Sequence, residues 1–408
     1  MDWADSDAQA TFRNEVRSFI EDRLPAFYKA RAQEADPSGE NDWQADIAIG
    51  DDDAREAALE WADALAEHGW AAPHWPKEYG GAGLTSMEQF IFNSEMAYTG
   101  APPVGGGGLR LLGPTILVHG TEEQKQKFLA PTLRGEMLWA QGFSEPGAGS
   151  DLASLQTRAV RDGDEYVING QKMWTSSGHK SNWIFGMFRT DPDAPKHRGI
   201  SFFVMDRATP GISVRPIVSM GFRHATNETF YEDVRVPADQ MIGEENRGWY
   251  VGMTLLDYER SGIGGAIENR QFLDRIIEHA HSTEGMAQRE HGGLKRTRSE
   301  LAEHYIASEV MFNLSFRVAS MQASGMLPNY EASMGKAFYT ELRQRVARAG
   351  MKTFGLYSNI WDPDDSRAAV SAEPTQVYVH SVVLTIAGGS SEIQRNIIAT
   401  RGLGLPRG

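Results

Sequence analysis

The chain of 408 residues contains no cysteine, which excludes disulfides, thiolate nucleophiles and thiolate metal sites. Long apolar runs are also missing, since no stretch approaches the roughly 20 apolar residues that a membrane span needs. The N-terminal stretch is charged throughout and lacks the basic start and apolar run of a signal peptide. We therefore expect a soluble, cytoplasmic protein with no membrane span.

Positive charge is scarce. The chain has 40 Lys and Arg against 55 Asp and Glu, and its formal net charge is -15. A surface that binds nucleic acid needs clustered Lys and Arg to meet the phosphates, so nucleic acid is not an expected partner. The hydrophobic fraction of 41% is that of an ordinary folded protein. At this length two or three subdomains are expected.

No metal-binding pattern stands out in the sequence. There is no HExxH motif. His279 and His281 are two residues apart on a predicted helix, so they point to different faces and make a poor ligand pair. We predict no metal site.

The pattern of apolar residues changes twice along the chain. Residues 1–135 show helical periodicity, 136–245 consist of short β-rich runs, and 246–408 return to long helical patterns. Asn169-Gly170, between apolar-rich flanks, is a hairpin-turn signal. The sequence predicts an α+β protein, mostly α, with an N-terminal helical domain, a middle β-domain and a C-terminal helical bundle.

Three stretches contain residues suited to ligand binding. WAQGFSEPGAGSD at 139–151 has glycines that let backbone approach a ligand, although a plain Gly-Pro turn is the simpler interpretation. QKMWTSSG follows, with an aromatic and three hydroxyls. AGGSSEIQRN at 387–396 combines glycines with one carboxylate. Either Glu392 is the catalytic group, or this loop binds and another residue reacts.

Together the motifs SEPGAGSD and NGQKMWTSSG closely resemble those of the acyl-CoA dehydrogenase family. The resemblance extends over nearly the whole chain, including WPKEYGG at 75–81, DVRVP at 233–237 and SSEIQRNIIA at 390–399. It implies a helical domain, a β-domain and a C-terminal four-helix bundle. It also implies FAD held between the β-domain and the C-terminal helices, with an acyl-CoA thioester stacked against the flavin.

The resemblance assigns residues to both ligands. Those expected at the flavin are Gln141, Phe143, Ser144, Trp174, Thr175, Ser176, Ser390 and Glu392. Those expected at the acyl-CoA are Ser150, Asp257, Arg260 and Gly389.

The resemblance also bears on the catalytic base. Many members of the family carry a glutamate at the position of Gly388, so that base is absent here. A second group, similar to the isovaleryl, long-chain and steroid side-chain enzymes, has the glutamate on a bundle helix, where LLDYERSGIGG supplies Glu259. A solvated Glu-Arg pair is the simpler interpretation of that stretch. We predict that Glu259 takes the α-proton, that the Gly388 amide donates to the thioester carbonyl, and that a hydride leaves for the flavin.

Two stretches depart from the family pattern for gripping the distal half of FAD across a subunit interface, QREHGGLKRTR at 288–298 and KTFGLYS at 352–358. The expected assembly is a homotetramer or a hetero-oligomer with a related chain, and the expected electron acceptor is an electron-transfer flavoprotein. Two alternatives stay open. The chain is a flavin-dependent monooxygenase or oxidase of the same fold, or it is a subunit that completes a partner's FAD site.

Overall fold

A computed structural model describes residues 5–32, 42–259, 264–291, 297–326 and 328–406, and the side chains of 257–259 and 291 lie outside this description. The chain is helical up to residue 133, forms a sheet between 139 and 242, and is helical again from 248, which confirms the predicted fold class. Among the described residues no helix is long and apolar enough to cross a membrane.

Contacts within the chain divide it into two compact units that interleave in sequence, and each is described by itself. The sheet unit comprises residues 40–83 and 103–259, and the helical unit comprises 1–39, 84–102 and 260–408. The predicted domain boundaries at 135 and 245 remain predictions.

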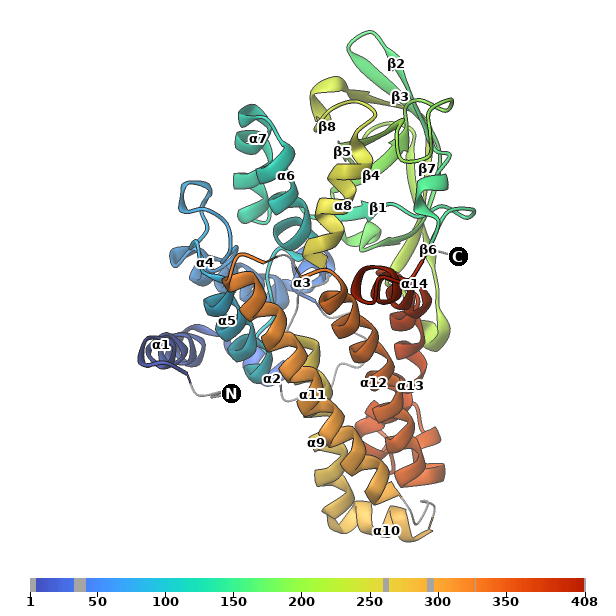
Figure 1. The fold of residues 1–408 in the computed structure, drawn as a ribbon. Coiled ribbons are helices and arrows are strands. Elements are labelled where there is room, and N and C mark those ends of the chain that lie inside the picture. The colour runs from blue at the N-terminus through green and yellow to red at the C-terminus, as the bar shows by residue number, and fades with distance from the viewer. Residues whose placement is uncertain (1–4, 33–41, 260–263, 292–296, 327, 407–408) are drawn as a thin grey trace. The chain divides into compact units, whose positions relative to one another are not determined.

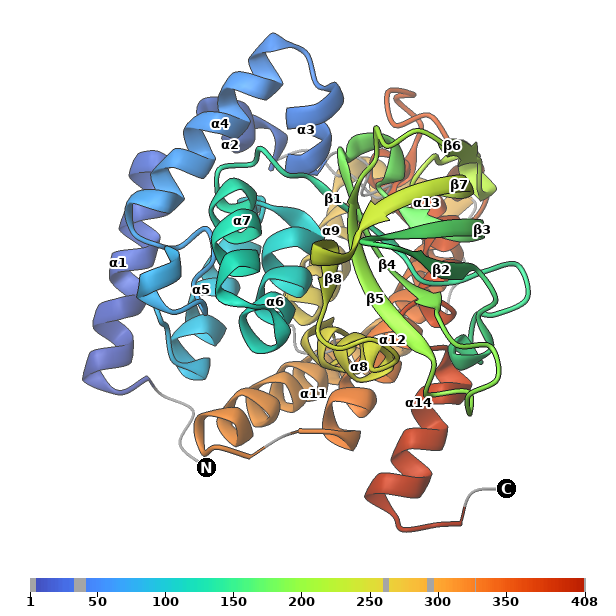
Figure 2. The ribbon, with the colours of Figure 1, turned by 90° about the horizontal axis from the view of Figure 1, so that it is seen from above.

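In its described residues the sheet unit contains one eight-stranded mixed sheet and five α-helices. Its strands are β1 Trp139–Gly142, β2 Arg158–Asp162, β3 Glu165–Ser176, β4 Trp183–Arg189, β5 Ile200–Asp206, β6 Ile212–Ile217, β7 Thr226–Pro237 and β8 Met241–Ile242. The helices are α3 Trp43–Ile49, α4 Asp52–Glu67, α6 Gly113–His119, α7 Glu122–Leu133 and α8 Gly248–Glu259. The strand order is β6-β7-β3-β2-β4-β5-β8, with β1 parallel to β4, and the central strands are seen side by side in Figure 2.

The predicted turn at Asn169-Gly170 is wrong. β3 runs through these residues and pairs with β7, with a register shift between Ile168 and Gly170. A Cβ on Gly170 would lie 2.8 Å from the Thr157 side chain, and its φ is +143°, so the glycine serves a close approach within the sheet. The hairpin turn lies earlier, between Asp162 and Glu165, where Gly163 has a φ of +66°.

The helical unit contains nine helices among its described residues. They are α1 Asp7–Arg23, α2 Ala26–Arg31, α5 Ser86–Thr99, α9 Gly264–His281, α10 Thr283–His291, α11 Thr297–Ala323, α12 Tyr330–Phe354, α13 Glu373–His380 and α14 Ser391–Ile397. Figure 1 shows the long helices α9, α11 and α12 beside one another. Their apolar faces meet in a core that includes Phe272, Leu342 and Val346, all fully buried.

Candidate active site

The segment that follows β1 lies against β3. The backbone N–H of Met173 donates to the carbonyl of Ser144 at 2.8 Å, which joins the stretch predicted to line the flavin to the strand that carries Trp174. Glu145 and Ala148 exchange two backbone hydrogen bonds, of 2.9 and 3.1 Å, and so close a tight turn around Pro146 and Gly147. Two of the motifs recognised in the sequence thus form one structural element.

A buried ion pair between Lys172 and Glu145 stabilises this element. The Nζ of Lys172, which is fully buried, lies 2.8 Å from Glu145 Oε1 and 3.1 Å from the carbonyl of Phe143. The Glu145 carboxylate also accepts from the backbone N–H groups of Gln156 and Thr157, at 2.6 and 2.9 Å. Three donors on one carboxylate satisfy most of its acceptor capacity, as a buried charge requires.

The pKa values of the pair follow from this environment. Burial raises the pKa of Glu145, but the Lys172 ammonium and the hydrogen bonds outweigh burial and bring it below the ordinary value. Burial lowers the pKa of Lys172 to about 8, against the opposing attraction of Glu145. Both groups are therefore charged at neutral pH.

Trp174 and its neighbours are placed by a bulge in β3. The register against β7 shifts between Lys172 and Thr175, and Trp174 has a φ of +61°. Its indole is 52% exposed, whereas Thr175 is fully buried and its Oγ1 accepts from the Thr229 hydroxyl at 3.1 Å. A bulge is a usual way to aim one side chain out of a regular strand, and here it presents a flat aromatic surface.

The carbonyl of Thr175 is held by a second small network. Asn227 Nδ2 donates to it at 3.0 Å and also lies 3.2 Å from His179 Nδ1, while Asn227 Oδ1 lies 2.8 Å from His224 Nε2. Because the amide nitrogen must face the carbonyl, His179 Nδ1 is the acceptor and His224 Nε2 is the donor. The two imidazoles stack with centroids 3.9 Å apart. Burial, followed by the neighbouring His224 and Lys180, lowers the pKa of His179 to about 4.

The remaining predicted residues of the sheet unit differ in exposure. The Phe143 ring is buried and makes edge contacts with Phe185 and Phe202, so only its backbone could face a ligand. Gln141 and Ser144 are half-buried, and Ser150 and Ser176 are exposed. All of them, with Trp174 and Thr175, belong to this unit.

The predicted residues Gly388, Gly389, Ser390 and Glu392 belong to the helical unit. Gly388 and Gly389 have φ values of +62° and +83°. Ser390 is the N-cap of α14, and its hydroxyl accepts from the backbone N–H of Ile393 at 3.4 Å. The loop carries hydrogen-bond donors and acceptors but no proton acceptor between Ala387 and Ser391.

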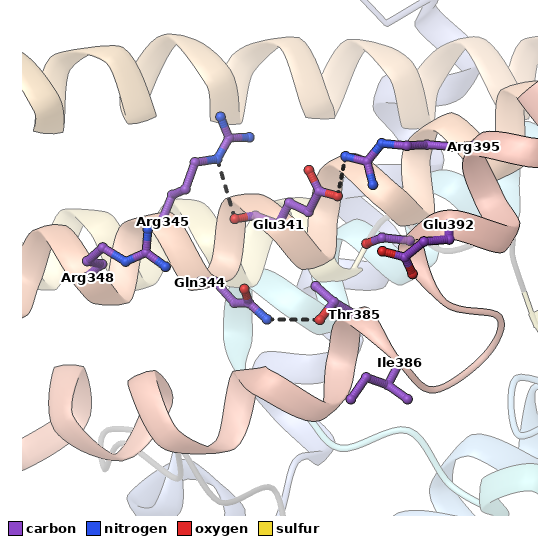
Figure 3. Close-up of a pocket in the computed structure, with 9 residues that line it drawn as sticks. Glu341, Gln344, Arg345, Arg348, Thr385, Ile386, Glu392 and Arg395 are labelled. Atoms are coloured by element: carbon purple, nitrogen blue, oxygen red, sulfur yellow. Dashed lines mark hydrogen bonds and ion pairs between the residues drawn. The ribbon is translucent and has the colours of Figure 1, made fainter.

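Glu392 lines a pocket of about 470 Å³ between α12 and α14 (Figure 3). Gln344, Thr385 and Arg395 also line it, and Arg395 is paired with Glu341 at 2.6 Å. The backbone N–H of Glu392 itself and the Ser390 hydroxyl hold the pKa of Glu392 below its ordinary value. A carboxylate of lowered pKa on an exposed helix start is a weak base, which supports the expectation that Glu392 is not the catalytic group.

Glu259 is the last residue of α8, the helix that follows the sheet. Its side chain and that of Asp257 lie outside the described part of the chain, as does Arg260. The roles predicted for these three residues therefore remain predictions. Residues 292–296 of the first altered stretch also lie outside the described residues, and KTFGLYS ends α12 and enters a 3-10 turn with Leu356 exposed.

The described residues of the sheet unit fit a flat heteroaromatic ring with a polar edge. The half-exposed Trp174 offers an aromatic face for stacking. Ser176 follows two residues later in β3, and Ser144 is joined to the same strand by the hydrogen bond from the Met173 N–H. A Cβ added to Gly147 or Gly149 would meet nothing within 4 Å, so a ligand can approach this backbone closely. These features match a flavin better than an ion or a small anion.

Sequence reasoning missed the groups that hold the site. Lys172, Glu145, Asn227 and the stacked histidines were not among the predicted residues. One signal was available: Lys172 precedes the predicted flavin contact Trp174 by two residues in a strand, at a buried position, where a lysine needs a buried partner. The sequence did not indicate which acid supplies it.

Comparisons with known proteins show the family to which the chain belongs. Family models for acyl-CoA dehydrogenases match in the order N-terminal domain at residues 6–136, middle domain at 140–234 and C-terminal domain at 246–403. The chain is 40% identical to the acyl-CoA dehydrogenase FadE29 of Mycobacterium tuberculosis over 82% of this chain and 84% of that protein. It is 34% identical to IpdE1 of the same organism, over 97% of both.

Two solved structures are similar over the full length of both chains. The Tcur3481-Tcur3483 steroid acyl-CoA dehydrogenase has a TM-score of 0.83 at 34% identity. The ChsE4-ChsE5 complex from Mycobacterium tuberculosis has a TM-score of 0.80 at 33% identity. The resemblance seen in the sequence motifs is confirmed.

Proposed function

Because the chain belongs to the acyl-CoA dehydrogenase family and is an acyl-CoA dehydrogenase, we propose that it oxidises an acyl-CoA to the trans-2-enoyl-CoA with FAD as cofactor and Glu259 as base. The observation that carries the choice of base is at Gly388. A glycine there can donate its backbone N–H but cannot take a proton, and the pKa of the nearby Glu392 is lowered. Glu259 is the carboxylate that the family pattern leaves for the task.

The proposed reaction gives different residues of the chain different chemical roles. The α-carbon of a thioester is a weak acid, so its deprotonation needs a positioned base and donors at the carbonyl oxygen where negative charge develops. In this proposal Glu259 removes the α-proton, and the N–H of Gly388 donates to the carbonyl oxygen. FAD, when bound, accepts the hydride that leaves the β-carbon.

The proposal assigns each ligand its own set of residues. Gln141, Ser144, Trp174, Thr175 and Ser176 would contact the flavin, Trp174 through its face and the others through polar groups. Phe143 would contribute its backbone, and Ser390 and Glu392 would also contact the cofactor. Ser150, Asp257, Arg260 and Gly389 would contact the acyl-CoA.

The proposed substrate is a bulky acyl group, namely a steroid side-chain thioester, and the assembly a hetero-oligomer with a related chain. The support is the similarity to a steroid enzyme and to the ChsE4-ChsE5 complex, together with the altered stretches at 288–298 and 352–358. An electron-transfer flavoprotein would reoxidise the flavin.

The test of the base is Glu259→Gln in the purified, FAD-loaded protein. We expect the variant to bind FAD but to lose bleaching of the flavin when the CoA thioester of a cholanic acid, of octanoate or of isovalerate is added under nitrogen. A carboxamide cannot accept the α-proton, so the loss should reach at least about 10²-fold. The comparison variant Glu392→Gln changes the other candidate carboxylate, and it should retain most of the bleaching rate because Glu392 is assigned no part in the proton transfer.

The same preparations separate the alternatives. Undiminished bleaching by Glu259→Gln would overturn the assignment of the base. Rapid reoxidation of the reduced wild-type flavin by air would favour an oxidase or monooxygenase. Near one FAD per chain in protein purified alone would indicate a self-sufficient enzyme, and little FAD would indicate that a partner chain completes the site.

A further inference from the structure

In the glycine loop, residues 387–390, the carbonyl groups of the two glycines accept hydrogen bonds from two side chains. Lys336 on α12 donates from its Nζ to the carbonyl of Gly389 at 2.7 Å and to the carbonyl of Leu384 at 3.0 Å. The Lys336 ammonium therefore connects the turn that precedes the loop, at Leu384, with Gly389. Hydrogen bonds from a charged donor are about twice as strong as neutral ones.

Gln394 on α14 reaches the same loop from the other end. It is fully buried, and its Nε2 donates to the carbonyls of Gly388 at 3.0 Å and of Gly389 at 3.2 Å. A flipped amide would place its oxygen against two carbonyl oxygens, so the hydrogen bonds fix the orientation of the side chain. The carbonyl of Gly389 thus has donors from two different helices.

The backbone between these contacts is held in an unusual conformation. Both glycines are left-handed, and a Cβ added at Gly389 would lie 2.6 Å from Gln394 Nε2. A glycine residue has more conformational freedom than any other residue. Without contacts of this kind the backbone of the loop would therefore sample many conformations. Among the described residues no backbone carbonyl accepts a hydrogen bond from the N–H of Gly388.

We propose that Lys336 and Gln394 are positioning residues that hold the carbonyls of Gly388 and Gly389, so that the N–H of Gly388 stays aimed at the thioester carbonyl oxygen. This inference rests on the proposed function, in which that N–H stabilises the developing charge. A donor contributes most when its orientation needs no rearrangement as the charge forms. The two side chains supply that orientation without touching the substrate.

The same helix offers a matched control. Gln344 lies two turns beyond Lys336 on α12, and its Nε2 donates to the carbonyl of Ser381 at 3.0 Å and to Thr385 Oγ1 at 3.1 Å, the latter bond drawn in Figure 3. It therefore anchors the turn that precedes the loop but makes no bond to either glycine. A substitution at Gln344 shows what is lost when only the preceding turn loses its hydrogen bonds. A substitution at Lys336 also removes the hydrogen bond to the Gly389 carbonyl.

The experiment compares Lys336→Met, Lys336→Arg and Gln344→Met as FAD-loaded proteins. The probe is acetoacetyl-CoA, an acidic thioester whose bound enolate is detected by its absorbance. We expect Lys336→Met to lower the bound enolate fraction at a fixed pH and to lower kcat by about 10- to 100-fold. KM, the FAD-to-chain ratio and the melting temperature should change little, and Lys336→Arg should restore part of both losses. Gln344→Met should resemble wild type in enolate fraction.

Each outcome has one interpretation. If Lys336→Met binds the same fraction of enolate as wild type, the positioning role is overturned. The proposed function would remain intact. An equal loss in Gln344→Met, or a loss of FAD in step with the loss of rate, would also overturn it, because loosening or misfolding would then explain the effect. Absence of any bound enolate in the wild type would contradict the proposed function itself.

Discussion

Two elements that carry predicted site residues differ in what stabilises their conformation. The element predicted to face the flavin, residues 141–148 with 172–176, is backed by a sheet and by the buried pair of Lys172 and Glu145, whose side chains are 0% and 7% exposed. The glycine loop is exposed at Gly388, and its carbonyls depend on Lys336 and Gln394. Damage to the first should therefore cost stability, and damage to the second should cost rate.

The largest effect is expected from breaking the buried pair. Lys172→Met leaves the Glu145 carboxylate buried with only its two backbone donors and removes the donor to the Phe143 carbonyl. Removing one partner of a buried pair typically costs about 3–5 kcal/mol. Denaturant unfolding followed by intrinsic tryptophan fluorescence should show the loss, with a lowered FAD-to-chain ratio.

The control for the buried pair is Lys196→Met, which removes an exposed ion pair with Asp151 in the same unit. It should leave the unfolding midpoint almost unchanged, because exposed pairs contribute little. Similar midpoint shifts in the two variants would contradict the view that burial holds this element.

A smaller effect, on rate rather than stability, is expected in the glycine loop. Gly389→Ala puts a Cβ 2.6 Å from Gln394 Nε2 at a φ of +83°, a conformation that costs other residues about 1–2 kcal/mol. The side chain must move, which should lower kcat by roughly tenfold while FAD binding persists. Steady-state kinetics and the flavin spectrum measure the two quantities.

Gly335→Ala is the matched control for the loop. It lies beside Lys336 in α12, and a Cβ there would meet nothing within 4 Å. The substitution should keep kcat and raise stability by up to about 1 kcal/mol. A rate loss in Gly335→Ala as large as that in Gly389→Ala would argue against a specific role for the loop conformation.

The smallest effect is expected in the pH dependence of stability, at His179 beside the element predicted to face the flavin. The pKa of His179 is lowered to about 4, below the value of about 6.5 in an unfolded chain. Between these values the unfolded state binds the additional proton, so this histidine makes stability fall as pH falls from about 6.5 to 4. NMR titration of the imidazole should find no protonation of His179 above pH 5, and His179→Gln should flatten the acid side of the melting-temperature profile.

The prediction at His179 fails if its resonance titrates near the ordinary value. That result would mean that His179 is less buried, or lies farther from His224 and Lys180, than in the arrangement observed.

Much of the architecture follows from the sequence, because helices and strands differ in the period of their apolar residues. The order of helical, β and helical regions, the absence of any cysteine chemistry and the family motifs around Ser144 and Trp174 were all available before the structure. The turn predicted at Asn169-Gly170 shows the limit of such local signals. A glycine was needed there because Thr157 presses against the strand, a reason that no neighbouring residue in the sequence reveals.

What holds the site was decided by the tertiary structure alone. Glu145 and Lys172 are 27 residues apart and Lys336 and Gly389 are 53 apart, so neither contact lies within the reach of a helical or strand period. A period tells which face of an element a side chain occupies, but its partner on another element depends on how the elements pack. By itself the sequence determined the kind of protein, and packing determined which charges and amides hold the residues that are predicted to meet its ligands.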